Sequence, residues 1–110
     1  MHLKLVMKDV TSVRVVDERL YVAVSSDREG CRIVELRDDG IKHIVYFSDT
    51  LCNILLGLRD SLLVSAGNTS YIVSNDGVKP VLRAEHGNWF WHAVEACGKV
   101  FVQEHGGFLW

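Results

Sequence analysis

An internal repeat constrains most strongly what this sequence can fold into. Three segments align without gaps, at residues 13–22, 55–64 and 93–102. Each has an apolar stretch, a short polar turn and a second apolar stretch, which is the pattern of a β-hairpin. The segments begin at residues 13, 55 and 93, so the offsets are 42 and 38 residues. Offsets of this length are typical of units that each hold four strands.

The second half of the unit recurs as well. The strand-like stretch 32–36 runs into the turn Asp38-Asp39-Gly40, and its counterpart 71–74 runs into Asn75-Asp76-Gly77. Asp-Gly favours the positive backbone angles of a tight hairpin. No stretch keeps a ten-residue helical period, so the sequence predicts an all-β protein.

Twelve strands are predicted, four to a unit. The first unit has strands at 11–16, 20–25, 32–37 and 41–47; the second at 52–58, 62–66, 70–74 and 78–83; the third at 91–96, 100–104 and 107–110. The third unit lacks its fourth strand, and residues 3–7 form a strand-like stretch that could supply it. We therefore expect one domain of three repeats, at about 11–47, 52–83 and 91–110, the last completed by 3–7.

These units have the length of β-propeller blades. A propeller ring typically holds 4–8 blades, so three are too few for one chain. Two copies would supply six, and cyclic dimers are the commonest oligomers. We expect a homodimer that forms a six-bladed ring. Two alternatives remain open: a fragment or half-propeller completed by a partner chain, and a plain sandwich or barrel.

Composition narrows the partners and the compartment. With a formal net charge of −2, the composition gives no sign of a basic patch that would bind nucleic acid. No apolar run is long enough to span a bilayer, and the N-terminus lacks the apolar stretch of a signal peptide. We expect a cytoplasmic protein with no membrane or nucleic-acid partner. Cys31, Cys52 and Cys97 are odd in number and widely spaced, so buried free thiols are expected rather than disulfides.

The stretch 91–106 and the turns 37–40 and 74–77 hold short motifs that resemble those of sialidase-like (BNR, or Asp-box) repeat propellers. Residues 91–95 followed by 99–106 are similar to the start of a blade in that family. The turns 37–40 and 74–77 occupy the place of its Ser-x-Asp-x-Gly-x-x-Trp motif, although each is one residue shorter between Asp and Gly and lacks the closing Trp. The resemblance implies a propeller fold and a function among glycosidases, carbohydrate binders and scaffolds. The arginines do not match the family's triad, so no catalytic residue is carried over.

The candidate site lies in two segments that a propeller would bring to one rim, 85–92 and 103–107. Stacking and hydrogen-bonding residues concentrate there, and the expected ligand-binding residues are His86, Asn88, Trp89, His92, Gln103 and His105. Glu85 and Glu104 are weak candidates for an acid/base pair, since glycoside cleavage needs two carboxylates. The histidine spacing matches no established metal motif, so neither a metal nor a cofactor is expected. Phe90 and Trp91 are expected to pack between blades rather than to bind a ligand.

The sequence thus predicts a non-enzymatic binding or scaffold propeller that presents one rim to a protein, peptide or glycan. The alternatives are a sialidase-like glycoside hydrolase and a half-propeller subunit that needs a partner chain. Glycosidase assays and the mass of the assembly in solution distinguish the three.

Overall fold

The computed structural model describes residues 7–26, 29–48, 50–85 and 88–110, which form eleven strands. The strands are β1 (Val10–Val16), β2 (Arg19–Ser26), β3 (Gly30–Arg37), β4 (Gly40–Phe47), β5 (Cys52–Leu58), β6 (Ser61–Ala66), β7 (Thr69–Ser74), β8 (Gly77–Arg83), β9 (Phe90–Ala96), β10 (Lys99–Glu104) and β11 (Phe108–Leu109). The all-β prediction is confirmed, and each strand begins and ends within two residues of its predicted range. The predicted strand 3–7 lies largely outside the described residues. No helix that could cross a membrane occurs among the described residues.

The strands form three antiparallel sheets in chain order. Sheet 1 has the order β1-β2-β3-β4, sheet 2 the order β5-β6-β7-β8, and sheet 3 the order β9-β10-β11. Tight turns explain why neighbours in sequence are neighbours in space. Asp17 and Glu18 have φ values of 50° and 65°, and Cys97 and Gly98 have 54° and 72°. Two successive positive φ angles match the right-handed twist of the flanking strands and close a two-residue hairpin.

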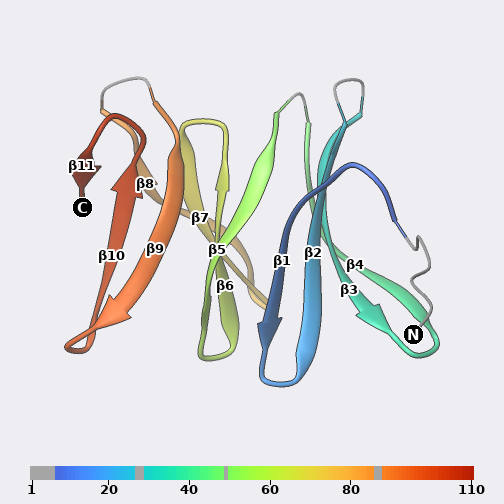
Figure 1. The fold of residues 1–110 in the computed structure, drawn as a ribbon. Helices are drawn as coiled ribbons and strands as arrows, with labels where there is room; N and C mark the ends of the chain where they lie inside the picture. Colours follow the sequence, from blue (N-terminus) through green and yellow to red (C-terminus); the bar gives the residue numbers. More distant parts are fainter. Residues whose placement is uncertain (1–6, 27–28, 49, 86–87) are drawn as a thin grey trace, which may run out of the picture.

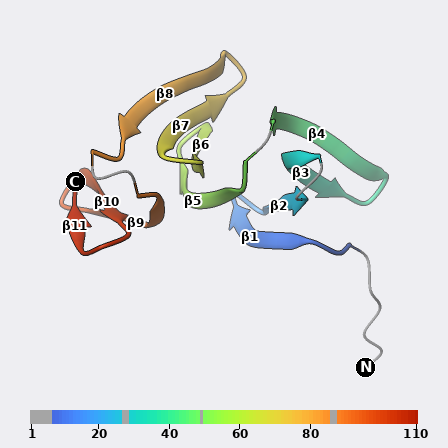
Figure 2. The same cartoon turned by 90° about the horizontal axis from the view of Figure 1, so that it is seen from above.

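The three sheets stand next to one another without closing into a barrel among the described residues (Figures 1 and 2). Their first strands, β1, β5 and β9, lie nearest the middle, and β4 and β8 lie farther out (Figure 2). Side chains join β1 to β5 where no backbone ladder does. The Thr11 hydroxyl donates to the Cys52 carbonyl at 2.8 Å, and the Ile54 amide donates to the Ser12 hydroxyl at 2.9 Å. These bonds hold the first two sheets in register without merging them.

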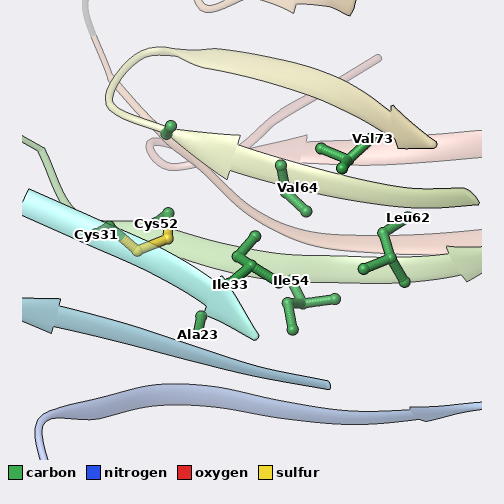
Figure 3. Close-up of a cluster of buried hydrophobic side chains, with 9 residues drawn as sticks. Ala23, Cys31, Ile33, Cys52, Ile54, Leu62, Val64 and Val73 are labelled. Carbon is green, nitrogen blue, oxygen red and sulfur yellow. A yellow bond between two sulfur atoms is a disulfide. The ribbon is translucent and has the colours of Figure 1, made fainter. Parts of the chain in front are cut away.

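The core between sheets 1 and 2 is built from small and branched side chains of both (Figure 3). Its buried members are Ala23, Cys31, Ile33, Cys52, Ile54, Leu62, Val64, Ala66 and Val73. Alternate residues of β2 and β3 face this layer, as the two-residue period of a strand requires.

Cys31 and Cys52 form a disulfide that joins β3 to β5 within this core, with their Cα atoms 5.8 Å apart (Figure 3). The prediction of free thiols is therefore wrong for this pair. Sequence spacing failed because each cysteine stands near the start of its strand, and those strand ends meet only when the sheets pack. Cys97 is a free cysteine but is exposed, since it occupies a turn.

A second core lies between sheets 2 and 3. Its buried members are Leu55, Leu63, Ala84, Phe90, Ala93 and Val102. Sheet 2 is therefore covered on both faces, which explains why five of the six residues of β6 are buried. Sheets 1 and 3 each have a second face that the described residues leave open in part: Val13, Val15, Val94 and Leu109 are all exposed.

Candidate functional site

The two segments that the sequence assigned to one rim do meet. The connection from β8 to β9 and the connection from β10 to β11 lie at the same end of the molecule (Figure 1). The backbone amide of His105 donates to the carbonyl of Trp89 at 2.8 Å. This bond extends the β9–β10 pairing past the end of the sheet and fixes the two segments side by side.

Aromatic rings gather at this junction. The imidazole of His105 stacks on the indole of Trp89, with ring centroids 4.3 Å apart and planes inclined by 19°. Trp91 meets the same imidazole edge-on, at 5.9 Å and 83°. Trp89 is 48% exposed and Trp91 56% exposed. We call Trp89, Trp91 and His105 the aromatic rim.

Neighbouring aromatic residues have a different role. Phe90 is fully buried and meets the ring of Trp110 edge-on at 6.4 Å. The prediction that Phe90 packs between sheets is confirmed. The same prediction for Trp91 is wrong for the single chain, in which Trp91 is exposed. The β-bulge next to Glu104 explains the difference, because pairing passes from His92 directly to Phe90 and skips Trp91.

The two candidate carboxylates have opposite environments. Glu85 is exposed, in the connection after β8. Glu104 is the last residue of β10, and it is fully buried. Its carboxylate accepts a hydrogen bond from the indole N–H of Trp110 at 3.0 Å and one from the amide of Asn88 at 3.4 Å. Both hydrogen bonds connect neighbouring segments to sheet 3, so the carboxylate of Glu104 has a structural role.

Two of the predicted ligand-binding residues lie away from the aromatic rim. His92 and Gln103 are directly opposite each other on β9 and β10. With Val94, Phe101 and Leu109 they line a groove of about 250 Å³ on the outer face of sheet 3. His86 lies outside the described residues. The predicted set therefore divides into Asn88, Trp89 and His105 at the rim, and a pair on the open sheet face.

Sequence reasoning missed a larger cavity, a cleft of about 540 Å³ between sheets 1 and 2. It lies at the end opposite the aromatic rim, where the β1–β2, β5–β6 and β7–β8 turns are found (Figure 1). Its lining mixes charged, polar and apolar residues of both sheets: Val16, Asp17, Arg19, Tyr21, Glu35, Lys42, His43, Ile44, Leu58, Asp60, Ser61, Leu62, Val73, Ser74 and Asn75. The sequence shows that Arg19, Glu35 and Lys42 are charged, but it does not show which neighbouring sheet their side chains face.

One ion pair organises the wall of this cleft. Arg37 donates from Nε to Glu35 Oε2 at 3.0 Å and from Nη2 to Oε1 at 3.3 Å. The hydrogen bond from Arg37 lowers the pKa of the Glu35 carboxyl, and the charges of Arg37, Arg19 and Lys42 lower it further, against desolvation. Glu35 is therefore held in its ionised form although it is buried.

Among the described residues, no group of three or more His, Cys, Asp or Glu side chains gathers closely enough to hold a metal ion.

Comparison with known proteins identifies no relative. No protein-family model, no curated protein and no solved structure matches this chain. The resemblance to sialidase-like repeat propellers therefore stays a prediction based on its short motifs.

Proposed function

We propose that this chain is a non-enzymatic binding module of the β-propeller type, whose aromatic rim takes a protein, peptide or glycan ligand. The observation that carries the proposal is that the exposed indoles of Trp89 and Trp91 both contact the ring of His105. Indole rings provide a large, rigid contact area at a low cost in conformational entropy. They stack on the apolar face of a sugar or on an apolar side chain, and the imidazole adds a hydrogen-bonding group.

The carboxylates support binding over glycoside cleavage. A glycosidase needs two carboxyl groups that flank one bond in an accessible site. Glu104 is buried, and its two oxygens accept hydrogen bonds from Trp110 and Asn88. Glu85 is exposed on the neighbouring connection. This arrangement gives Glu104 a fixed structural role and leaves one accessible candidate carboxylate at the rim.

The test is a ligand screen with matched variants. Wild-type protein is screened on an oligosaccharide array and on a peptide array, and the hits are measured again by tryptophan fluorescence titration. Trp89→Ala should weaken binding about tenfold or more, as truncation of an aromatic hot spot typically does. Tyr46→Ala is the control, because Tyr46 is a similarly exposed aromatic residue (47%) on the outer strand β4. Hits that bind Trp89→Ala as tightly as wild type, or the absence of any hit, would contradict the proposal.

We further propose that two copies form the six-bladed ring. The outer face of sheet 1 carries an apolar row across four strands, Val15, Leu20, Leu36 and Ile41, paired in register. The outer face of sheet 3 carries Val94, Phe101 and Leu109 around the 250 Å³ groove. Contiguous exposed apolar surface of this kind is typical of interaction sites. Packing sheet 1 of one copy on sheet 3 of another would cover both faces, and a twofold axis would form the same contact twice.

The open edge of β11 supports the same assembly. Sheets 1 and 2 have four strands, and β11 has no described strand on its other side. Four residues, 48–51, separate the last strand of sheet 1 from the first strand of sheet 2. If residues 3–7 form a strand, residues 8–9 would be a similarly short connection from it to β1. Residues 3–7 of one copy, placed beside β11 of the other, would supply the fourth strand of sheet 3.

Light scattering on a sizing column tests the ring. The wild type should have twice the 12.4 kDa mass of the chain. Val15→Asp and Leu109→Asp, both at exposed positions (68% and 70%), should yield monomers. Val81→Asp is the control, since Val81 is also exposed (51%) but lies on the outer strand β8. A wild-type mass of 12.4 kDa would refute the ring, and co-purification of a second chain would point to the half-propeller alternative.

The cytoplasmic location expected from the sequence stays a prediction, and the Cys31–Cys52 disulfide argues against it. Disulfides form and persist mainly in oxidising compartments. Mass spectrometry of alkylated protein from its native source would show whether the pair is oxidised there.

A further inference from the structure

The three sheets repeat one backbone hydrogen bond at the end of the molecule where the aromatic rim lies (Figure 1). In each sheet an amide at the end of the second strand donates to the carbonyl just before the first strand: Ser25 to Asp9 at 2.9 Å, Gly67 to Leu51 at 3.2 Å, and His105 to Trp89 at 2.8 Å. The sequence repeat aligns the same residues. Positions in one sheet can therefore be assigned to equivalent positions in another.

Trp91 and His105 of the rim are equivalent to Thr11 and Ser25 of sheet 1. Strand pairing supports the match, since the β1–β2 ladder skips Thr11 as the β9–β10 ladder skips Trp91. Within each pair the two side chains also contact each other. Thr11 and Ser25 both bond to the following sheet: the Thr11 hydroxyl donates to the Cys52 carbonyl at 2.8 Å, and the Cys52 amide donates to the Ser25 hydroxyl at 3.3 Å. Trp91 and His105 thus stand where sheet 3 would meet the first strand of a following sheet.

The first residue of the first strand in each sheet shows where a preceding sheet is needed. Cys52 and Phe90 hold this position in sheets 2 and 3, and they are 1% and 0% exposed in the cores that the preceding sheets form with their own. Val10 holds the position in sheet 1, which has no preceding sheet among the described residues, and it is 40% exposed. A preceding sheet from another chain would cover Val10.

The open face of sheet 3 lacks a cover in the complementary way. Equivalent residues of the second strands pair with Ile33 in sheet 1, Ser70 in sheet 2 and Leu109 in sheet 3. Ile33 and Ser70 belong to the sheets that have a following sheet, and both are fully buried. Leu109 is 70% exposed. Sheet 1 of a second copy fits here, because it is the sheet that needs a preceding one.

We infer that a second copy completes the aromatic rim: Trp91 and His105 of one chain lie against the partner's Val10. The inference rests on the ring proposed above and names the residues at its seam. A twofold axis would form the same contact twice, once at each rim. Trp89 stays open to a ligand, because its equivalent Leu51 is 60% exposed although sheet 2 has a neighbour on both sides. The ligand site of the rim is then shared by both chains.

Photo-crosslinking tests the contact without a ligand. Trp91 is replaced by p-benzoylphenylalanine, another large aromatic residue, which suits its exposed position (56%). A mixture of ¹⁴N- and ¹⁵N-labelled protein is irradiated, so that links between copies are recognised by their mass. The link should join position 91 to the tryptic peptide 9–14, which contains Val10. The same replacement at Val81, which is exposed on β8, is the control and should give no link to that peptide.

Light scattering on the same samples separates the two possible failures. A monomeric wild type would refute the ring and this inference together. A dimer in which position 91 links to other peptides, or forms no link between copies, would overturn this inference alone. A failed ligand screen of the rim would bear on its proposed function and leave the crosslink unaffected.

Truncation variants measure the coupling across the seam. Trp91→Ala should raise the dissociation constant of the dimer about tenfold, as loss of an aromatic hot spot typically does. Val10→Ala should raise it less, since a smaller side chain is removed. The double variant should show less than the product of the two effects, because residues in contact are not independent. Val81→Ala is the control and should leave the dissociation constant unchanged. Independent effects of Trp91→Ala and Val10→Ala would contradict the contact.

Discussion

Breaking the disulfide between β3 and β5 should destabilise the protein by an amount that loop length predicts. Cys31 and Cys52 are separated by 21 residues in sequence. Cross-linking a loop of that length removes conformational entropy from the unfolded chain, which corresponds to about 3 kcal/mol at 25 °C. Small domains have a total stability of about 5–15 kcal/mol, so this loss is a large fraction of the whole.

Urea denaturation measures the effect. Oxidised protein is compared with protein reduced in urea and refolded under reductant, at one fixed protein concentration. The difference of about 3 kcal/mol should lower the urea midpoint by roughly 1–3 M, given the usual slopes for domains of this size. A Cys31→Ala/Cys52→Ala variant should show the same midpoint under oxidising and reducing conditions, and Cys97→Ser should retain the wild-type difference. Coincident midpoints for oxidised and reduced wild type would refute the role assigned to the disulfide.

Three further changes probe the packing and the electrostatics. Gly57→Ala should lower the free energy of unfolding in urea by about 1–3 kcal/mol, because the added Cβ would stand 2.3 Å from a methyl carbon of Val16. Adding Val16→Ala should restore part of that loss. Full stability of Gly57→Ala alone would contradict the close approach of β1 and β5. Phe90→Ala should lower the free energy of unfolding by about 3–5 kcal/mol in the same assay, since the ring is fully buried between sheets 2 and 3. A loss below about 1 kcal/mol would argue against that core. The pKa of Glu35 is lowered first by its hydrogen bond from Arg37. The ionised carboxyl therefore stabilises the fold at pH values above its unfolded pKa, and this contribution is lost as the pH falls through the lower folded pKa. Glu35→Gln should therefore show a smaller loss of unfolding free energy than wild type between pH 7 and the acid range, and parallel pH profiles would contradict the ion pair.

The strands were predictable because their signals are local. Alternating and continuous apolar stretches mark the strands, and Asp-Gly at residues 39–40 and 76–77 marks the turns that join them. The meeting of 85–92 with 103–107 followed from the repeat, since equivalent connections of successive hairpins fall at the same end of a sheet. Trp89 and His105 are the observed contact between them.

The errors arose where a residue's environment depends on a neighbouring sheet. The sequence makes Glu104 a weak candidate for an acid/base pair, yet its carboxylate is buried and accepts hydrogen bonds from Trp110 and Asn88. Trp91 was expected inside and is exposed, because a bulge removes it from the pairing of β9 with β10. Neither a bulge nor a buried hydrogen-bond network has a signature in the residues themselves.

The sequence by itself therefore determined the strand positions, the tight turns, the three repeats and the aromatic character of one rim, because each follows from residues a few positions apart. Only the tertiary structure decided that Cys31 bonds to Cys52, that Glu35 is paired with Arg37 on the wall of a cleft, and that the described residues leave the outer faces of sheets 1 and 3 open in part. The physical reason is that hydrogen bonding along a strand is local, whereas the packing of one sheet on another joins residues that the chain separates by a whole repeat.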